Sequence, residues 1–351
     1  MKNNVLFVST ESITGLPFLH QYETCFDGCY DLLFWDRSGI RSGFPRANLI
    51  PFEHVATGYA EKIKGYLGFK RFAERHIRNS SYEKVILLYT QSAVLLGNVL
   101  LERYKGHYIC DIRDYSFEGF SPYRFFEGRV LRGSALNVIS SEGYKSFLPK
   151  GIEYHIMHNN HINTATMRVR RNGNNPIVIG NIGGIRFHDQ CRRFIKCFSE
   201  DDRYRLLFCG NRAQELKQSC REMDLSHVEF VDRFPPEDVE KYLLQCDLLF
   251  NLYGNHTPLL DYALSNRLYY CAEYGIPILT CPDTFMHQIE EKYHLGFCVD
   301  LNNRLSSEIL YREYNSFDFE LFDKGRSEFL ERCVQDNETT LGKISAFLSS
   351  I

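Results

Sequence analysis

Glycine and arginine residues suited to binding phosphate occur where an apolar run gives way to a helical pattern. In IGNIGGIRF, residues 179–187, a buried strand is expected to end at Ile182, and Gly183 and Gly184 follow. Glycine lets the backbone approach a ligand, and the next helix would direct free N–H groups and its positive dipole end toward an anion. Arg186 adds a guanidinium that can hold phosphate through two hydrogen bonds. The stretch predicts a phosphate site; the alternative is an ordinary turn with a solvated arginine.

A second stretch, SNRLYYCAEYGIPIL at residues 265–279, places Asn266 and Arg267 near the start of a predicted helix. Gly275 suits the end of that helix, and a buried strand follows. If the two stretches are neighbours in one sheet, Arg267 and Arg186 converge. Two cations and a helix N-terminus could then stabilise a departing diphosphate without a metal ion. Neither stretch contains the full G-x-G-x-x-G pattern, so a dinucleotide site is not predicted.

Charged residues that could act on an acceptor hydroxyl come at the end of another predicted strand. They are Asp111, Arg113 and Asp114, and Asp114 is the best candidate for orienting the hydroxyl or accepting its proton. The alternative is a pair of solvated turn charges bridged by Arg113. Glu142 starts the next helix and is a further acceptor-side candidate, although an acidic residue there also suits the helix dipole. Gly15 lies in the first loop, which by its position should face the ligands.

The histidines and cysteines do not predict a metal site. His155 lies on a predicted strand and His161 in a linker, so these two and His158 would not share a face as zinc ligands do. A more fitting role for them is lining a cleft between domains. The 12 Cys residues include no C-x-x-C pair and suit reduced core positions. We therefore expect no metal and no other cofactor.

The elements that must position these residues alternate between short apolar runs and helical segments. The alternation extends through residues 5–157 and restarts at 177–299, which is typical of parallel sheets covered on both faces. Residues 169–175 between them are polar and rich in Gly and Asn, as linkers are. The sequence predicts an α/β fold of two Rossmann-like domains facing across a cleft, with ligands beyond the carboxyl ends of the strands. The expected parts are an acceptor-side domain 1–168, a donor domain 176–318, and a helical segment 319–351 that packs back on the first domain.

Composition excludes several classes of protein. The chain of 351 residues is long enough for two domains. Its formal net charge of -3 argues against a dedicated nucleic-acid binder. The start, MKNNVLFVST, lacks the apolar stretch of a secretory signal, and no apolar run is long enough to span a membrane. We expect a cytoplasmic protein.

Two basic and aromatic segments raise the question of membrane contact. Residues 58–78 intersperse Lys and Arg with aromatic residues such as Tyr66 and Phe69, and residues 123–132 read YRFFEGRVLR. Such helices could rest on anionic lipid headgroups, or could simply present a solvated basic face. A lipid-linked acceptor would favour peripheral contact with the inner face of the cell membrane.

The second half resembles the donor domain of GT-B glycosyltransferases, especially family 4, which builds bacterial surface polysaccharides. IGNIGGIRF resembles that family's strand-plus-glycine opening with its phosphate-binding arginine, and LLFCGN (206–211) resembles the next strand and its glycine. SNRLYYCAEYGIPIL resembles the family segment that ends in G-x-P, with Arg267 at its basic position. Residues 228–252 and 294–300 fit the intervening and closing strands. In the first half, 111–118 and 135–149 resemble acceptor-domain strands more loosely.

The resemblance implies transfer of a sugar from a nucleoside-diphosphate sugar to a glycan acceptor, lipid-linked, in surface polysaccharide synthesis. It also implies retention of anomeric configuration, no required metal, and domain closure that excludes water. Asp114, Arg186 and Arg267 would be catalytic. The implied donor-binding residues are Gly183, Gly184, Arg186, Asn211, Asn266, Arg267 and Tyr270.

One departure from the family concerns the nucleotide ribose. The family has a glutamate on the last donor-domain helix that bonds the ribose, where this chain has Tyr270, and Tyr262 stands eight residues earlier. The E-x7-E pair is therefore absent, and a tyrosine hydroxyl would replace one hydrogen bond without its charge-assisted strength. Two alternatives stay open: a nucleotide-sugar epimerase of the same architecture, and a catalytically weak partner protein that binds nucleotide sugars.

Overall fold

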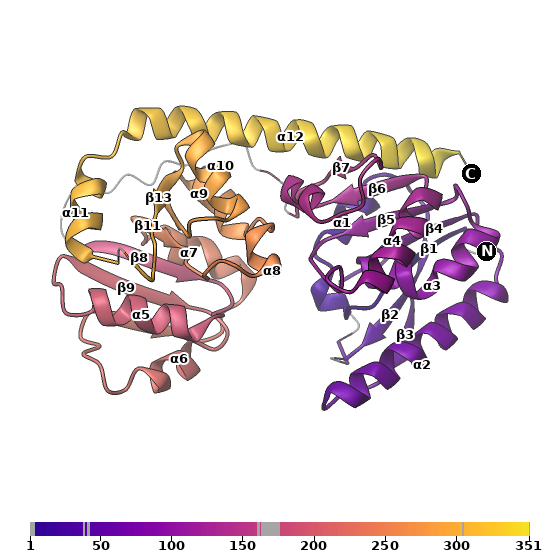
Figure 1. The fold of residues 1–351 in the computed structure, drawn as a ribbon, viewed down its shortest axis with the longest axis horizontal. Coiled ribbons are helices and arrows are strands. Elements are labelled where there is room, and N and C mark those ends of the chain that lie inside the picture. The colour runs from indigo at the N-terminus through magenta and orange to yellow at the C-terminus, as the bar shows by residue number, and fades with distance from the viewer. Residues whose placement is uncertain are drawn as a thin grey trace. The chain divides into compact units, whose positions relative to one another are not determined.

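The computed structural model describes residues 4–37, 39–40, 43–159, 162, 176–303 and 305–350 (Figure 1). Contacts divide the chain into two compact units, one of Met1–His161 with Gln335–Ile351 and the other of Ile162–Val334. Each unit holds one sheet of parallel strands with flanking helices. The prediction of two Rossmann-like α/β units is confirmed. The predicted linker at 169–175 lies outside the described residues.

The sheet of the first unit has the strand order β3-β2-β1-β4-β5-β6-β7. Its elements are β1 (Val5–Ser9), α1 (Leu19–Glu23), β2 (Tyr30–Asp36), β3 (Ala47–Glu53), α2 (Tyr59–Arg78), β4 (Lys84–Leu88), α3 (Thr90–Arg103), β5 (Tyr108–Ile112), α4 (Ser121–Gly133), β6 (Leu136–Ile139) and β7 (His155–Ile156). Every residue of the central strands β1, β4 and β5 is buried, because helices cover both faces of the sheet. Short 3₁₀ helices at Ile13–Gly15 and Glu142–Ser146 follow β1 and β6.

The edge strand β3 is the one strand of this sheet that the apolar pattern misses. It pairs with β2 along its whole length, from Ala47 opposite Tyr30 to Glu53 opposite Asp36. Its residues are only half-buried or exposed, and Pro51 interrupts the run. Proline is tolerated at a sheet edge because no further strand needs its missing N–H.

The sheet of the second unit has the order β10-β9-β8-β11-β12-β13, again with parallel neighbours. Its elements are β8 (Ile177–Ile182), α5 (His188–Phe198), β9 (Tyr204–Cys209), α6 (Ala213–Ser219), β10 (Val228–Val231), α7 (Val239–Leu243), β11 (Leu248–Phe250), α8 (Pro258–Asp261), α9 (Asn266–Tyr274), β12 (Ile278–Thr280), α10 (Phe285–Tyr293), β13 (Gly296–Cys298) and α11 (Ser307–Asn315). A 3₁₀ turn, Pro236–Asp238, precedes α7.

Side chains of the second sheet alternate between two apolar clusters. On β8, Ile177 and Ile179 join the cluster that contains the buried face of α5, while Val178 and Ile182 join the cluster that contains the buried face of α9. Successive strand residues point to opposite faces, so this alternation shows that helices cover both sides of the sheet. The covered sheet leaves its loops at the carboxyl ends of the strands as the places for a ligand.

The C-terminal helix α12 (Phe319–Ser349) contributes to both units. Phe322, Phe329 and Leu330 belong to the core of the second unit. Ile344 and Leu348 belong to the core of the first. In the described parts of the chain, no helix, α12 included, is both long and apolar enough to cross a membrane.

Candidate functional site

The carboxyl ends of β8 and β9 meet at two glycines. Gly183 follows β8 with φ 112° and donates its N–H to the carbonyl of Cys209 at 2.8 Å. Gly210 follows β9 with φ 140°, and a Cβ there would lie 1.7 Å from the carbonyl oxygen of Gly183. Only glycine adopts such angles easily, and at Gly210 there is also no room for a side chain. The Ile185 N–H bonds the Asn211 carbonyl at 2.9 Å, which brings Asn211 to the same pair of loops.

We expect Gly210→Ala to lower the free energy of unfolding by about 2 kcal/mol or more, because backbone strain and overpacking each cost about 1–3 kcal/mol. Urea denaturation measures the loss. Gly184→Ala is the matched control, since no atom lies within 4 Å of a Cβ built on Gly184. Equal losses in the two variants would show that the approach of the two loops is not required for stability.

Arg267, in the first turn of α9, is buried beside Gly183 without a negative partner. Its exposed fraction is 6%, and its Nη2 would lie 3.6 Å from a Cβ on Gly183. Nη2 donates to Oδ1 of Asn181 at 2.6 Å, and the guanidinium lies 5.1 Å from the centre of the Tyr253 ring. Nε has no hydrogen-bond partner, and no carboxylate among the described residues acts on the guanidinium. Burial lowers the pKa of Arg267 to about 10, so the side chain is still charged at neutral pH.

An unpaired buried cation has a definite chemical consequence. Removing a charge from water is unfavourable unless an opposite charge and hydrogen bonds compensate it. Here the guanidinium keeps a free N–H donor next to a glycine loop, where backbone can approach a ligand. The arrangement is suited to an anion with several oxygens, such as a phosphate.

The structure brings several of the predicted donor residues to Arg267. Arg186 is exposed. Burial is the main cause of the lowered pKa of Arg267, and the like charge of Arg186 lowers that pKa further, so the two cations lie near each other. Tyr270, one helical turn further along α9, is half-buried and also acts on Arg267. Gly184 and Asn266 are exposed, in the glycine loop and at the first position of α9 respectively.

Other residues at this site escape the sequence analysis. The rings of Tyr253 and Phe187 pack at a tilt of 39° with their centres 5.1 Å apart, and Phe187 has the left-handed φ of 56°. Asn251 directly follows β11, is 6% exposed, and its Oδ1 has no hydrogen-bond partner. The available signal is the run LLFNLYG (248–254), where polar residues and a glycine follow a buried strand next to β8.

Asp111 and Arg113, predicted on the acceptor side, form a buried ion pair. Their exposed fractions are 0% and 3%, and two contacts join them, Nη2 to Oδ2 at 2.7 Å and Nε to Oδ1 at 2.6 Å. The Tyr22 hydroxyl donates to Asp111 at 2.6 Å. Nη1 of Arg113 donates to the Met157 carbonyl and to the Asn159 side chain, each at 2.9 Å. Arg113 does bridge to an aspartate, but the pair is buried and bound to protein groups rather than solvated.

The remaining acceptor-side candidates lie at loops after β1, β5 and β6. Asp114 is exposed, and its charge helps to raise the pKa of Tyr89, for which burial is the main cause. The Tyr89 hydroxyl donates to the Gly15 carbonyl at 2.8 Å, so Gly15 and Asp114 both lie near this ring. Glu142 is exposed and pairs with Lys145 at 3.0 Å in its own helical turn. The structure thus connects Gly15 with Asp114 but does not connect Glu142 to either.

The histidines have protein partners of their own. His155 lies 3.3 Å from Nζ of Lys343, and Nε2 of His158 lies 3.6 Å from Asp336. His161 lies outside the described residues. Within the described residues, no group of three His, Cys, Asp or Glu side chains is arranged to hold a metal ion.

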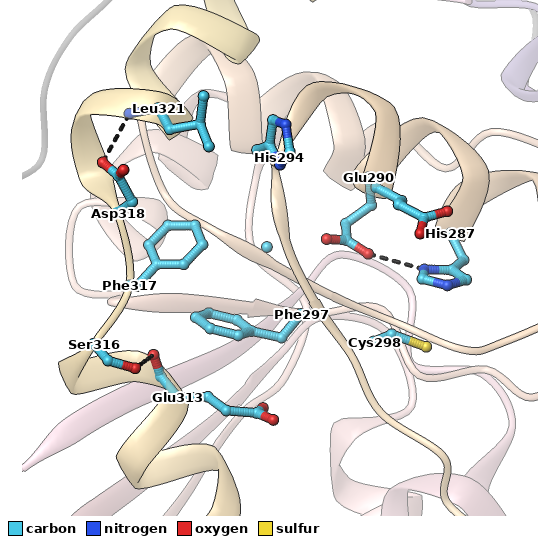
Figure 2. Close-up of a pocket in the computed structure, with 12 residues that line it drawn as sticks. His287, Glu290, His294, Phe297, Cys298, Glu313, Ser316, Phe317, Asp318 and Leu321 are labelled. Carbon is cyan, nitrogen blue, oxygen red and sulfur yellow. Dashed lines mark hydrogen bonds and ion pairs between the residues drawn. The ribbon is translucent and has the colours of Figure 1, made fainter.

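Figure 2 shows a pocket of the second unit that none of the predicted donor residues lines. Its volume is about 420 Å³, and it runs along β13 between α10, α11 and the start of α12. Within it Nδ1 of His287 lies 3.0 Å from the Glu290 carboxylate, and the rings of Phe297 and Phe317 pack with centres 4.7 Å apart. The pocket is therefore a feature separate from the glycine loops.

Comparison with known proteins rests on structure. No protein-family model matches the sequence, and no curated protein matches it. A sucrose-phosphate synthase from Thermosynechococcus elongatus is similar over 99% of this chain and 100% of its own, with a TM-score of 0.72 and 11% identity. HepE from Anabaena, in complex with UDP and glucose, is similar over 100% of both chains, with a TM-score of 0.68 and 12% identity. The lipopolysaccharide outer core galactosyltransferase WaaB is similar over 96% of this chain and 98% of its own, with a TM-score of 0.63 and 12% identity.

These neighbours are GT-B glycosyltransferases. The chain has the GT-B fold. The predicted resemblance to this fold is confirmed along the whole chain, including the first half, where the sequence similarity is looser. The comparisons do not distinguish family 4 from other GT-B families, so that assignment stays a prediction.

Proposed function

We propose that the protein transfers a sugar from a nucleoside-diphosphate sugar to a glycan acceptor. The observation that carries the proposal is the buried, unpaired guanidinium of Arg267 beside Gly183. The GT-B fold supports it, because a neighbour with that fold, HepE, is described in complex with UDP-glucose. A diphosphate would supply the negative charge that Arg267 lacks.

The chemistry follows from where charge develops. When the bond between the anomeric carbon and the diphosphate oxygen breaks, negative charge grows on the leaving group. Arg267 and Arg186 would bind that charge, and the free N–H groups of the glycine loop would add hydrogen bonds. With two cations in this role, the proposed transfer needs no metal ion. Retention of anomeric configuration is part of the proposal because the family resemblance implies it.

The ribose would be held differently from the family pattern. Tyr270 is half-buried one turn after Arg267 and acts on its guanidinium, which supports a role for its hydroxyl in bonding a ribose attached to the same diphosphate. A hydrogen bond from the ribose to a neutral hydroxyl is weaker than one to a carboxylate. We therefore propose that the diphosphate end supplies most of the donor affinity.

The proposal is tested by incubating the protein with UDP-, GDP-, ADP- and dTDP-linked sugars in the presence of a chelator and measuring release of the nucleoside diphosphate. Release from one class of donor, faster with added glycan acceptor, is expected. Tight nucleotide binding without release or transfer would instead favour the weak partner protein, and interconversion of sugars without release would favour an epimerase.

A lipid-linked acceptor is proposed from the surface of the first unit. Large apolar side chains are exposed on and around α2 and α4, namely Val55, Tyr59, Ile63, Leu67, Phe117, Phe120, Phe125 and Phe126. Tyr66 on α2 contacts Phe117, which contacts Tyr123 on α4, so the two groups are continuous. Exposed basic residues of the same helices include Lys62, Lys64, Arg71, Arg124 and Arg129. Exposed aromatic and basic side chains together suit an anionic lipid surface.

We expect Phe125→Ser/Phe126→Ser to reduce sedimentation with vesicles of anionic lipid by about tenfold or more, because two large apolar side chains are lost from the contact. The matched control is Leu244→Ser/Ile309→Ser, which removes two exposed apolar side chains from the second unit. Equal binding by both variants and the unchanged protein would contradict the proposed contact.

A further inference from the structure

Two glutamates of the first unit, Glu118 and Glu127, are buried against each other. Their exposed fractions are 2% and 0%. Glu118 lies in the loop between β5 and α4, and Glu127 lies in the middle of α4. One oxygen of Glu118 accepts the Ser116 N–H at 2.5 Å. The other three carboxyl oxygens of the pair have no partner other than each other.

The surroundings do not supply a compensating positive charge. Glu127 faces Cys110 on β5 and Tyr154 before β7, and both are neutral groups. Arg124, exposed on the same helix, is the cation that acts on it, and it forms no ion pair with either glutamate in the described structure. On the side of Glu118 lie the carboxylate of Asp114 and the phenol of Tyr123.

Two carboxylates cannot both be charged cheaply in such a place. Burial disfavours the charged form of each, and a like charge in contact disfavours it further. Burial, followed by the charge of Glu118, raises the pKa of Glu127 to about 8. At neutral pH the pair therefore holds one proton, which closes a hydrogen bond between the two side chains.

We propose that protonated Glu127 is a positioning residue, which holds the 113–120 loop on α4 through its hydrogen bond to Glu118. That loop carries Asp114, the candidate for the acceptor hydroxyl, and the exposed Phe117 and Phe120. Loss of the proton leaves two buried negative charges in contact and frees the loop. The effect on transfer rests on the proposed function, whereas the effect on the loop does not.

The direction of the pH effect follows from the pKa of Glu127, which is about 8 in the folded protein against an ordinary 4.5. The folded state binds this proton more tightly than the unfolded state. The stability that the proton provides is complete at low pH and is lost as the pH rises toward 8. Glutamine at position 127 keeps a hydrogen-bond donor at every pH and should remove this dependence.

The test compares melting temperatures of the unchanged protein, Glu127→Gln and the control Glu83→Gln, an exposed glutamate of the same unit, between pH 6 and pH 9. The melting temperature of Glu127→Gln minus that of the unchanged protein should increase by about 4 °C or more between pH 6 and pH 8 and then level off. Glu83→Gln should run parallel to the unchanged protein. A difference in melting temperature between Glu127→Gln and the unchanged protein that stays constant with pH would overturn the proposal.

Hydrogen exchange of the 113–120 amides at pH 8.5 provides a second readout, together with Glu118→Gln in case Glu127→Gln folds poorly. Either glutamine variant should protect this loop more than the unchanged protein does. Where transfer is measurable, its rate should fall above pH 8 in the unchanged protein but not in Glu127→Gln. Equal loop protection in all three proteins would contradict the role of the shared proton, whatever the outcome for donor binding.

Discussion

Arg267→Gln is expected to weaken the binding of a nucleoside diphosphate by about 30-fold or more, because removing one partner of a buried charge pair costs about 2–5 kcal/mol. The ligand-free variant should nevertheless be at least as stable as the unchanged protein. Burial lowers the pKa of Arg267 from 12.5 to about 10, so the charged side chain destabilises the ligand-free folded state by about 3 kcal/mol at neutral pH, and the variant is relieved of this cost. Loss of its bond to Asn181 offsets part of that gain. Calorimetric titration and thermal melting measure the two effects.

The matched control is Arg205→Gln, an exposed arginine on β9 of the same sheet that pairs with Glu229. It removes the same charge from the same unit, so it should leave nucleotide affinity within about twofold. Unchanged affinity in Arg267→Gln, or a loss as large in Arg205→Gln, would contradict the placement of the diphosphate at Arg267.

Asp111→Ala is expected to lower the free energy of unfolding by about 3–5 kcal/mol, because it leaves the buried guanidinium of Arg113 without its partner. The Tyr22 hydroxyl loses its acceptor at the same time. The additional change Arg113→Met should recover part of the loss, since it removes the stranded charge. Urea denaturation of the single and double variants measures both.

Asp114→Asn is the control for a neighbouring carboxylate that is exposed. Its stability should change by no more than about 0.5 kcal/mol, as is usual for surface substitutions, while transfer to acceptor falls. A small stability loss in Asp111→Ala combined with abolished transfer would instead assign Asp111 to the chemistry.

The two sheets are predictable from sequence because most of their strands are buried on both faces. In β1, β4, β5 and β8 every residue is buried, so each strand appears as a mostly apolar run, even though β4, β5 and β8 each contain one charged or amide side chain. Local breaks are less visible. Residues 258–274 form two helices rather than one: α8 ends at Asp261, and α9 begins at Asn266, where the Ser265 side chain caps it.

Candidate residues that depend on local sequence features can be selected from the sequence, whereas the burial of a side chain by distant partners cannot be predicted from it. Gly183 and Arg186 follow directly after the buried strand that ends at Ile182, a signal contained within nine residues of sequence. The buried pair of Asp111 and Arg113 is bound by Tyr22, Met157 and Asn159, which come from distant parts of the chain. No sequence pattern indicates that a charged turn will be buried by such partners. For the same reason an acidic pair nine residues apart gives no sign of sharing a proton.

The most direct measurement is an experimental structure of the protein with bound UDP, the nucleotide named for the similar HepE structures. The account predicts that the diphosphate oxygens lie within hydrogen-bond distance of the Arg267 guanidinium and of the backbone N–H group of Gly184. It also predicts that Arg186 turns toward the same phosphates. A nucleotide bound elsewhere, with the Nε of Arg267 still unpaired, would contradict it.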